Sequence, residues 1–577
     1  MIVFICICSF CGFSQDVNAI DAILVLTGAS SPEELDDYEY ELYTTLIANP
    51  LNINVNRVNK FVTSGIFTSY QAASLMDYRL RHGDVMSFSE LATIDGFNEE
   101  FVRKIRPFIS LASSEIGNLR QDGCKNEFIL RGGVKTSYPG GADYGYGLKY
   151  SFDSPSGLFT RAGFSRSYSY NPIYPDAISL SVGWDFKRLP ISMMLGDFNA
   201  RFGQGLALWN GMSMGGLSSP TSMMKRPSGL SPSSSFSGSQ SMTGAAASVM
   251  LRTVTLNISL ALPGIKTFNE FSMLPAVNFI WNHKHGQMGI THYLDFNTCL
   301  NDMKTSLDMA WCLRGTDVFS EISYDWSRMV PAALAGASFP VGDLFRLGTM
   351  LRAYPSSYNA SRSGAQRSTA KCSNEYSCTF AGEFLTQDRI HSATFSADAA
   401  YFPESKSKGN SHDGQIRLNG KWECTKAKYV LKASISERIR SWGEPFRTEF
   451  KADLSLLWRR WSLNLRTDML HCVNLAGLAY AEVVFKNEQL TVCGRGGAFF
   501  VDDWEDRIYI YERDAPGGFN IPAMYGRGVW AAVYAGFKPS WKVKFYLRAA
   551  VTTYPFMSSE KRKPGKAELK LQCAFSF

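Results

Sequence analysis

The chain contains no run of about 18 or more uncharged apolar residues, the length that a membrane-spanning helix requires. A polytopic helical membrane protein is therefore excluded. Charge is also sparse, because Asp, Glu, Lys and Arg make up only 19% of the 577 residues, whereas aromatic residues reach 13%. A chain this long exceeds one ordinary soluble domain, and its composition favours one very large closed architecture over several domains.

The sequence has little of what builds a catalytic or metal site. Its seven histidines are dispersed, and no Ser-His-Asp or Cys-His set can be assembled from their spacing. His283 and His285 would share a strand face and could chelate a metal, but the adjoining Lys284 and Gly286 favour a turn. We therefore expect no catalytic residue, no metal site, no cofactor and no enzyme activity.

The twelve cysteines do not form a disulfide framework. Three of them lie within the first eleven residues and the other nine are scattered, with no pair of CxxC motifs for zinc. Cys372 and Cys378 are close enough in sequence for a loop disulfide if the chain is exported. That disulfide is a weak expectation of the spacing alone.

The first 14 residues resemble a secretory signal peptide. An apolar run from Met1 to Phe13 precedes Ser14, although the usual basic residues at its start are missing. A lipoprotein anchored through Cys11 is the weaker alternative, because the residues before that cysteine match the small-residue pattern poorly. We expect an exported protein whose mature chain begins near Gln15.

Basic residues are absent from Gln15 to Pro50. This stretch carries eight acidic residues and no Lys or Arg, so the rest of the chain holds a net charge of +15 within the overall +7. A basic surface of that size attracts polyanions such as DNA or lipopolysaccharide, although the charge is spread over many residues. Within residues 15–50 we predict helices at Val17 to Leu26 and from Ser31-Pro32 onward, with an apolar face that packs on the next segment.

Residues 51–113 contain two similar helix-turn-helix phrases. The first runs from Val62 to Arg79 around Gly65, and the second from Ile94 to Ile105 around Gly96. In each, an apolar residue follows the glycine and apolar positions then recur at helical spacing. The segment predicts a small all-α domain built from paired helical hairpins.

After a linker at residues 114–125, the period changes to that of strands. Apolar and polar residues alternate through Phe450 to Trp458 and again through Trp461 to Met469, which predicts a hairpin with one apolar and one polar face. Tyr429 to Ser436 and Trp541 to Ala549 repeat the pattern. Strands of about ten residues suit a tilted crossing of a bilayer, so residues 126–577 predict a closed transmembrane β-barrel of roughly 22 to 26 strands.

The C-terminal segment supports this prediction most sharply. Leu569, Leu571, Cys573 and Phe575 alternate with polar or small residues, and the chain ends on Phe577. This is similar to the terminal strand by which outer-membrane proteins are recognised for barrel assembly. The expected fold class is therefore α+β and multidomain, with a small all-α N-terminal domain followed by a large antiparallel barrel.

The hairpin segment resembles the helix-hairpin-helix repeat of competence DNA receptors. The resemblance rests on "LNIN" at Leu51, the Gly65 turn, "MDYR" at Met76, "HGDVMSFSEL" at His82 and "GFNEEFVRKIRPFI" at Gly96. In that family, hairpin glycines let backbone amides at a helix N-terminus approach a phosphate, without sequence preference and with strong salt dependence. The resemblance implies contacts to nucleic acid from the following residues: Gly65, Ile66, Phe67, Thr68, Gly96, Phe97, Asn98, Arg103 and Lys104.

Two features of the hairpins depart from that family. Its usual turn is Gly-apolar-Gly, whereas here Phe67 and Asn98 replace the second glycine, and Phe67 cannot cheaply adopt a left-handed conformation. Charge is nearly balanced, with seven basic and six acidic residues between Leu51 and Leu111. A purely structural or protein-docking hairpin domain has about equal standing.

Two further motifs, "LGDFNARFGQGLALWNG" at Leu195 to Gly211 and "RIYIYERDAPGGFNIPAMYGRG" at Arg507 to Gly528, extend the resemblance. Together with the hairpins they resemble a Bacteroidota family in which a helix-hairpin-helix module precedes an outer-membrane barrel. The implied location is the outer membrane, with the N-terminal domain in the periplasm. The implied partners are outer-membrane lipid, the barrel assembly machinery, and either DNA, as in DNA uptake, or another periplasmic or envelope protein.

The alternative to DNA binding is a transporter, porin or scaffold whose hairpin domain is a plug or a docking module. Two local features bear on it. Gly203-Gln204-Gly205 could suggest a phosphate cradle, but a barrel turn fits better because Gly-Lys-Ser/Thr does not follow. Residues 212–244 are rich in Ser, Gly and Met and predict a long extracellular loop or one folded into the lumen as a constriction.

Overall fold

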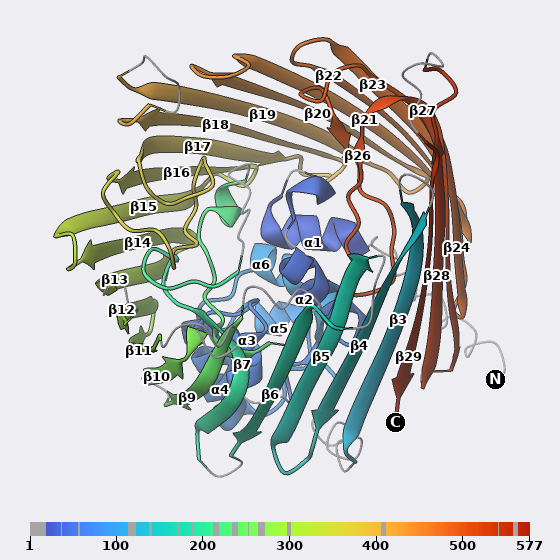
Figure 1. The fold of residues 1–577 in the computed structure, drawn as a ribbon. Helices are drawn as coiled ribbons and strands as arrows, with labels where there is room; N and C mark the ends of the chain where they lie inside the picture. The colour runs from blue at the N-terminus through green and yellow to red at the C-terminus, as the bar shows by residue number, and fades with distance from the viewer. Residues whose placement is uncertain are drawn as a thin grey trace, which may run out of the picture.

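In a computed structural model the chain forms a closed antiparallel β-barrel with helices inside it (Figure 1). The structure describes residues 19–577 except 30, 36, 56–57, 114–122, 138–140, 170–173, 187–188, 212–218, 234–240, 252, 264–271, 297–301, 406–410, 541 and 558–563. The predicted signal peptide, residues 1–14, and most of the predicted linker lie outside the described residues. Within them, no helix is both long and apolar enough to cross a membrane.

The N-terminal segment is helical, as its periodicity predicts. Its elements are α1 (Ala19–Thr27), η1 (Pro32–Glu34), α2 (Asp37–Ala48), β1 (Leu51–Asn52), α3 (Val58–Thr63), α4 (Ser69–His82), α5 (Phe88–Leu91), α6 (Glu99–Ile105), η2 (Arg106–Phe108) and β2 (Ile109–Ser110). The helix predicted from Ser31 is divided into η1 and α2. β1 pairs in parallel with β2 and so brings the two ends of the hairpin segment together.

Among the described residues the barrel wall has 24 strands, within the predicted range of roughly 22 to 26. Its first part contains β3 (Lys125–Ser137), β4 (Gly141–Asp153), β5 (Leu158–Ser169), β6 (Ala177–Asp185), β7 (Ile191–Arg201), β9 (Met242–Met250), β10 (Val254–Ala261), β11 (Leu274–His283), β12 (Gly286–Asp295), β13 (Asp302–Leu313), β14 (Thr316–Asp325) and β15 (Val330–Val341). Its second part contains β16 (Phe345–Tyr354), β17 (Glu375–Leu385), β18 (His391–Phe402), β19 (Asp413–Thr425), β20 (Tyr429–Arg440), β21 (Phe446–Leu457), β22 (Trp461–His471), β23 (Leu475–Lys486), β24 (Leu490–Val501), β27 (Gly526–Ser540), β28 (Val543–Thr553) and β29 (Lys566–Ser576).

Closure joins the last strand to the first. β29 pairs with β3, and the backbone amide of Asn126 donates to the carbonyl of Phe577 at 2.9 Å. The terminal strand that the sequence predicts is therefore the closing strand of the barrel. Three short elements lie outside the wall: η3 (Pro220–Ser222), β8 (Gly229–Pro232), which pairs with β7, and the β25 (Ile508–Tyr509) and β26 (Ala523–Met524) ribbon.

The wall is apolar outside and polar inside. Along β11, Val277, Phe279 and Trp281 are 42–43% exposed, while Asn278 and Asn282 between and after them are buried. A soluble protein buries its apolar side chains, so this inversion is what a barrel in lipid with a polar lumen requires. The predicted hairpin at 450–469 matches β21 and β22, and its apolar residues Phe450, Leu465 and Met469 face outward.

The two ends of the barrel differ. Connections such as 284–285, 314–315 and 426–428 are short, whereas 202–241, 355–374 and 502–525 at the opposite end are long. The start of β3 and the end of β29 lie at the short-turn end, because the strand number is even. In outer-membrane barrels short turns face the periplasm and long loops face outward.

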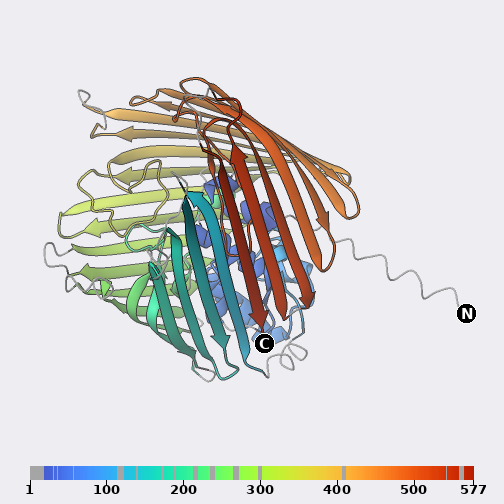
Figure 2. The same ribbon diagram turned by 45° about the vertical axis from the view of Figure 1, so that its right-hand side comes forward.

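The helical segment lies in the barrel lumen rather than beside the barrel (Figures 1 and 2). It makes hydrogen bonds or ion pairs to strands all around the wall, including β4, β6, β12, β16, β20 and β22. The described helices therefore occupy the lumen, as in the alternative in which the hairpin domain is a plug, and not the periplasmic position that the family resemblance implies. We call the described residues between 19 and 113 the plug.

Candidate functional site

The plug has its own hydrophobic core. Apolar side chains from α1, α2 and both hairpins form one buried cluster, to which the barrel wall contributes only Met250 among the described buried residues. Phe67, the residue that departs from the family turn, is fully buried there with its ring 5.7 Å from Phe61 and 5.9 Å from Phe97. Aromatic rings at these separations pack favourably. The plug is thus a compact body that does not depend on the wall for its core.

The first predicted nucleic-acid-binding turn is folded into this core and onto the wall. Gly65 has φ 70°, which explains the glycine, and Ile66 is fully buried like Phe67. Thr68 caps α4 in a capping box with Gln71. The amide of Tyr70, in the first turn of the helix, donates to the Gln287 side chain on β12 at 3.3 Å.

The second predicted turn is held in a similar way. Gly96 has φ 87°, and a side chain there would meet the Tyr70 ring at 2.5 Å. Phe97 is buried in the plug core, and Asn98 caps α6 by accepting from the Phe101 amide at 2.7 Å. Asn98 has φ −140°, so it does not use the left-handed conformation that asparagine tolerates. Side chains of the plug and of the barrel wall thus already engage the helix N-termini that a phosphate would need.

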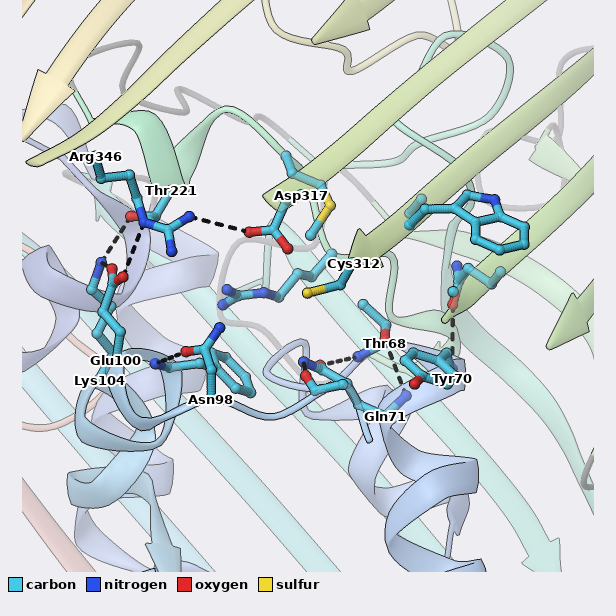
Figure 3. A pocket seen from close by; sticks show the side chains of 18 residues that line it. Thr68, Tyr70, Gln71, Asn98, Glu100, Lys104, Thr221, Cys312, Asp317 and Arg346 are labelled. Carbon is cyan, nitrogen blue, oxygen red and sulfur yellow. Dashed lines mark hydrogen bonds and ion pairs between the residues drawn. The ribbon is translucent and has the colours of Figure 1, made fainter. Parts of the chain in front are cut away.

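Both turns border a small pocket between the plug and the wall (Figure 3), with about 60 Å³ of water-accessible space. Lys104, the one buried base among the predicted residues, donates to Glu100 and to Thr221, each at 2.9 Å. Glu100 in turn accepts from Arg346 on β16 at 3.0 Å. Lys104 and Glu100 therefore link the plug to the wall.

Arg103 does not border the pocket of Figure 3. It is exposed and borders a larger pocket of about 650 Å³ between α5, α6 and the short turns after β15 and β17. Arg103 is the only exposed residue of the predicted nucleic-acid-binding set. The set is therefore divided between the plug core, the pocket of Figure 3 and the short-turn end.

The acidic residues of the plug pair with basic residues of the wall. Glu41 pairs with Lys149 on β4, Asp21 with Lys432 on β20 at 2.8 Å, and Glu100 with Arg346. The charge asymmetry of the sequence is thus partly balanced within the molecule. Some of the bases that were expected to attract polyanions pair with the plug instead.

Glu33 is the most deeply placed of these acids. Its side chain is 8% exposed and pairs with Arg466 at 3.3 Å and Lys451 at 3.7 Å, on adjacent strands β22 and β21. Burial alone would raise the pKa of this carboxyl, but the two cations outweigh burial and lower it to about 2. Glu33 is therefore ionised at neutral pH and attracts both bases.

A long loop covers the plug from the other end. Residues 502–525, which we call the luminal strap, run inward from the rim and contain most of the predicted motif at Arg507 to Gly528. The Tyr511 amide donates to Glu33 at 3.1 Å, and the Tyr511 hydroxyl is 2.9 Å from that of Tyr40 on α2. Arg513 pairs with Glu482 on the wall at 3.1 Å. The strap therefore connects the rim, the wall and the plug.

The other long loop also folds inward. Residues 219–233 include η3 and β8, and Thr221 and Arg226 from this loop contact α6. The described part of that loop therefore folds into the lumen, which is the second of the two positions predicted for residues 212–244. Gly203-Gln204-Gly205 forms a turn rather than a phosphate cradle, and the amides of Gln204, Leu206 and Ala207 donate to Glu321 on β14.

The structure also places the cysteine pair and the histidine pair that the sequence singled out. Cys372 and Cys378 are free, because Cys372 is buried in a luminal loop while Cys378 is exposed on β17. The predicted disulfide is therefore wrong. The His283 ring lies 5.3 Å from Trp281 and 5.1 Å from Trp311, in an aromatic cluster at the short-turn end. Among the described residues no group of three or more His, Cys, Asp or Glu could hold a metal.

The site missed by sequence reasoning is the plug–wall interface. Its bases, Lys149, Arg346, Lys432, Lys451 and Arg466, belong to five different strands and share no local motif. The signal that could have found them was the opposite charge of residues 15–50 and the rest of the chain. Only an enclosed arrangement makes that charge separation an interface.

Fold and site together define a class: a closed β-barrel whose lumen is occupied by a helical plug. No family model and no curated protein matches the chain. Similar solved structures include the copper transporter OprC, with 9% identity, a TM-score of 0.42 and coverage of 78% of this chain and 80% of that one. The P pilus usher PapC translocation pore has 10% identity, a TM-score of 0.43 and coverage of 78% and 99%.

The siderophore receptor PirA from Pseudomonas aeruginosa has 10% identity, a TM-score of 0.40 and coverage of 79% and 80%. Identities and TM-scores this low do not indicate a function for this chain. The resemblance to a Bacteroidota helix-hairpin-helix family stays a prediction.

Proposed function

We propose that the protein is an outer-membrane conduit gated by its N-terminal plug. The observation that carries this proposal is the nature of the plug–wall contact. The plug keeps its apolar core to itself and meets the wall mainly through ion pairs and hydrogen bonds. Polar contacts of this kind are typical of interfaces that open and close, whereas permanent interfaces are mainly apolar.

The location follows from the wall. The apolar outer face, the closed strand order and the aromatic residues near the strand ends suit a bilayer that accepts β-barrels. With the short turns in the periplasm, the plug would be reached from the periplasm and the luminal strap from outside. We propose transport, and no catalysis, for this lumen.

DNA binding is the less favoured function of the hairpins. Their turns lie against the wall, and the helix amides at Gln71, Tyr70 and Phe101 already have acceptors. A duplex could reach them only after the plug had left the lumen. The geometry therefore supports a gate better than a nucleic-acid receptor.

The first test removes the plug. Deletion of residues 16–111 is expected to turn a chain of low conductance in planar bilayers into an open pore, because the occupied lumen becomes water-filled. The deleted protein must still run as a folded barrel before and after heating in gel electrophoresis. Unchanged conductance in a folded barrel would show that the plug is not the gate.

A further inference from the structure

Four arginines gather on three neighbouring strands of the wall near the long-loop end. They are Arg417 on β19, Arg438 and Arg440 on β20, and Arg447 on β21, and we call them the arginine quartet. In the strand register Arg417 lies opposite Arg438, and Arg438 lies opposite Arg447. Residues directly opposite in antiparallel strands have Cβ atoms about 5 Å apart. The three strands lie next to one another in the wall (Figure 1).

The quartet faces the lumen. Ile416 and Leu418, which flank Arg417, are 45% and 44% exposed on the outer face. Phe446, next to Arg447, is also exposed there. Alternation along each strand then points all four arginines inward, where they are half-buried. Their position close to the loops after β18 and β20 places them near the outer mouth of the lumen.

No carboxylate pairs with these guanidinium groups among the described residues, although the four cations lie within electrostatic reach of one another. The Glu505 carboxylate of the strap acts electrostatically on Arg440 and lies 3.9 Å from Arg507, and the other acids around the quartet are engaged elsewhere. Asp413 accepts from the hydroxyls of Ser405 and Ser441, and Asp506 accepts from three backbone amides at Cys472, Val473 and Asn474. Like charges placed directly opposite destabilise a sheet unless an anion neutralises them.

The same wall shows what such bases do when an anion is present. Further along these strands and β22, Lys432, Lys451 and Arg466 pair with plug carboxylates of Asp21 and Glu33. One stripe of bases therefore runs from the plug toward the outer mouth. The bases of its inner part pair with carboxylates of the plug and also of the wall, Glu423, Glu449 and Asp468, whereas those of its outer part form no ion pair with a carboxylate of the described residues.

Neutral contacts orient part of the quartet. Arg440 donates to the Gln415 side chain at 3.0 Å and lies 5.4 Å from the Trp442 ring. Arg447 donates to the carbonyls of Glu505 and Arg507 in the luminal strap, at 2.7 and 3.3 Å. These contacts hold guanidinium groups in place without cancelling their charge. Oriented guanidinium forks suit two-point hydrogen bonding to phosphate or carboxylate oxygens.

We propose that the arginine quartet binds a multivalent oxyanion, a solute carrying several phosphate or carboxylate groups, that enters from the outer mouth. That this anion is the solute transported by the conduit rests on the proposed function. That the quartet binds the anion does not rest on it. Arg447 also donates to carbonyls of the luminal strap, so a bound anion would compete with the strap for Arg447. The same strap carries Tyr511, whose amide donates to Glu33 of the plug.

The test uses the full-length protein in detergent and isothermal titration with inorganic pyrophosphate and, separately, with citrate. The double variant R417Q/R438Q is expected to weaken binding of the preferred anion at least tenfold. The control R459Q/R460Q removes two exposed arginines at the turn after β21, at the other end of the barrel, and should bind like the unaltered protein. Comparison of the two titrations distinguishes a phosphate site from a carboxylate site.

Two results would overturn this site: no binding of either anion by the unaltered protein at low salt, or equal losses in the test and control variants. Impaired folding of R417Q/R438Q is not expected, since the change removes repelling charges. The single variant R438K, which keeps the charge but loses the fork, is a second measurement and should bind more weakly than the unaltered protein. Plug gating has no part in these titrations, so anion binding can succeed or fail independently of the conductance experiment.

Discussion

Replacement of Glu33 with glutamine is expected to weaken docking of the plug by about 3 kcal/mol, a roughly 100-fold change in the ratio of closed to open lumen. This free energy follows from the lowered pKa of Glu33. A carboxyl whose pKa falls from 4.5 to about 2 is stabilised by about 3 kcal/mol by its surroundings when it is ionised. The variant leaves Arg466 and Lys451 facing a neutral side chain. Bilayer recordings should show frequent openings where the unaltered protein is mostly closed.

The control for this experiment is E99Q. Glu99 is an exposed carboxyl of α6 at the short-turn end, and the same change of charge there removes no contact with Arg466 or Lys451. Equal opening in E33Q and E99Q would mean that the total charge, rather than the buried ion pair, holds the plug. No opening in either variant would show that Glu33 does not contribute to docking.

Acid should have a similar effect to the E33Q substitution. The folded-state pKa of Glu33 lies below its unfolded value, so its stabilising contribution is full above pH 4.5. The contribution is lost as the pH falls from about 4.5 toward 2. Openings of the unaltered protein should increase across this window, and E33Q should lack this part of the pH dependence.

Replacement of Phe67 with alanine is expected to destabilise the plug by about 3 to 5 kcal/mol, as for other fully buried phenylalanines. The ring is completely buried and touches Phe61, Phe97 and Phe101, so its removal leaves a cavity at the centre of the plug core. Because the wall contributes little to that core, the barrel itself should keep its stability. Limited proteolysis should cut the plug of F67A while the strands stay resistant.

The matched control is L80A in α4. Leu80 is 82% exposed, so its loss removes almost no buried surface and should leave proteolysis unchanged. Loss of barrel heat resistance in F67A, in step with cleavage of the plug, would contradict the view of the plug as a self-contained body. Resistance of F67A equal to that of L80A would show that the hairpin core is not what holds the plug together.

Much of the architecture was predictable because it depends on local patterns. The alternation in 450–469 and in 568–577 corresponds to β21, β22 and β29, and Gly65 and Gly96 have the positive φ values that their turns require. The motifs at 195–211 and 507–528 also marked unusual places, since both include segments that fold into the lumen. Local composition singled them out without showing their direction.

The position of the plug was not predictable in this way. The sequence of the hairpin segment is equally compatible with a separate domain and with a plug, because its apolar side chains are buried in its own core in either case. Phe67 illustrates the difficulty: in the sequence it is a costly replacement for the second glycine of the turn, whereas in the structure it is a central core residue. Its burial depends on Phe97 and Phe101, which belong to the second hairpin.

The sequence by itself determined that the N-terminal part of this protein is helical and begins with an acidic stretch. It also determined that the rest of the chain consists of strands with one apolar face, and that the last segment is a strand of the barrel. Only the tertiary structure decided that the acidic part sits inside the basic barrel, and that Arg417, Arg438 and Arg447 face one another across strands. The physical reason is the distance along the chain between the interacting residues. Turns and alternation are set by neighbouring residues, whereas the contents of a lumen and the register across a closed sheet are set by groups far apart in the chain.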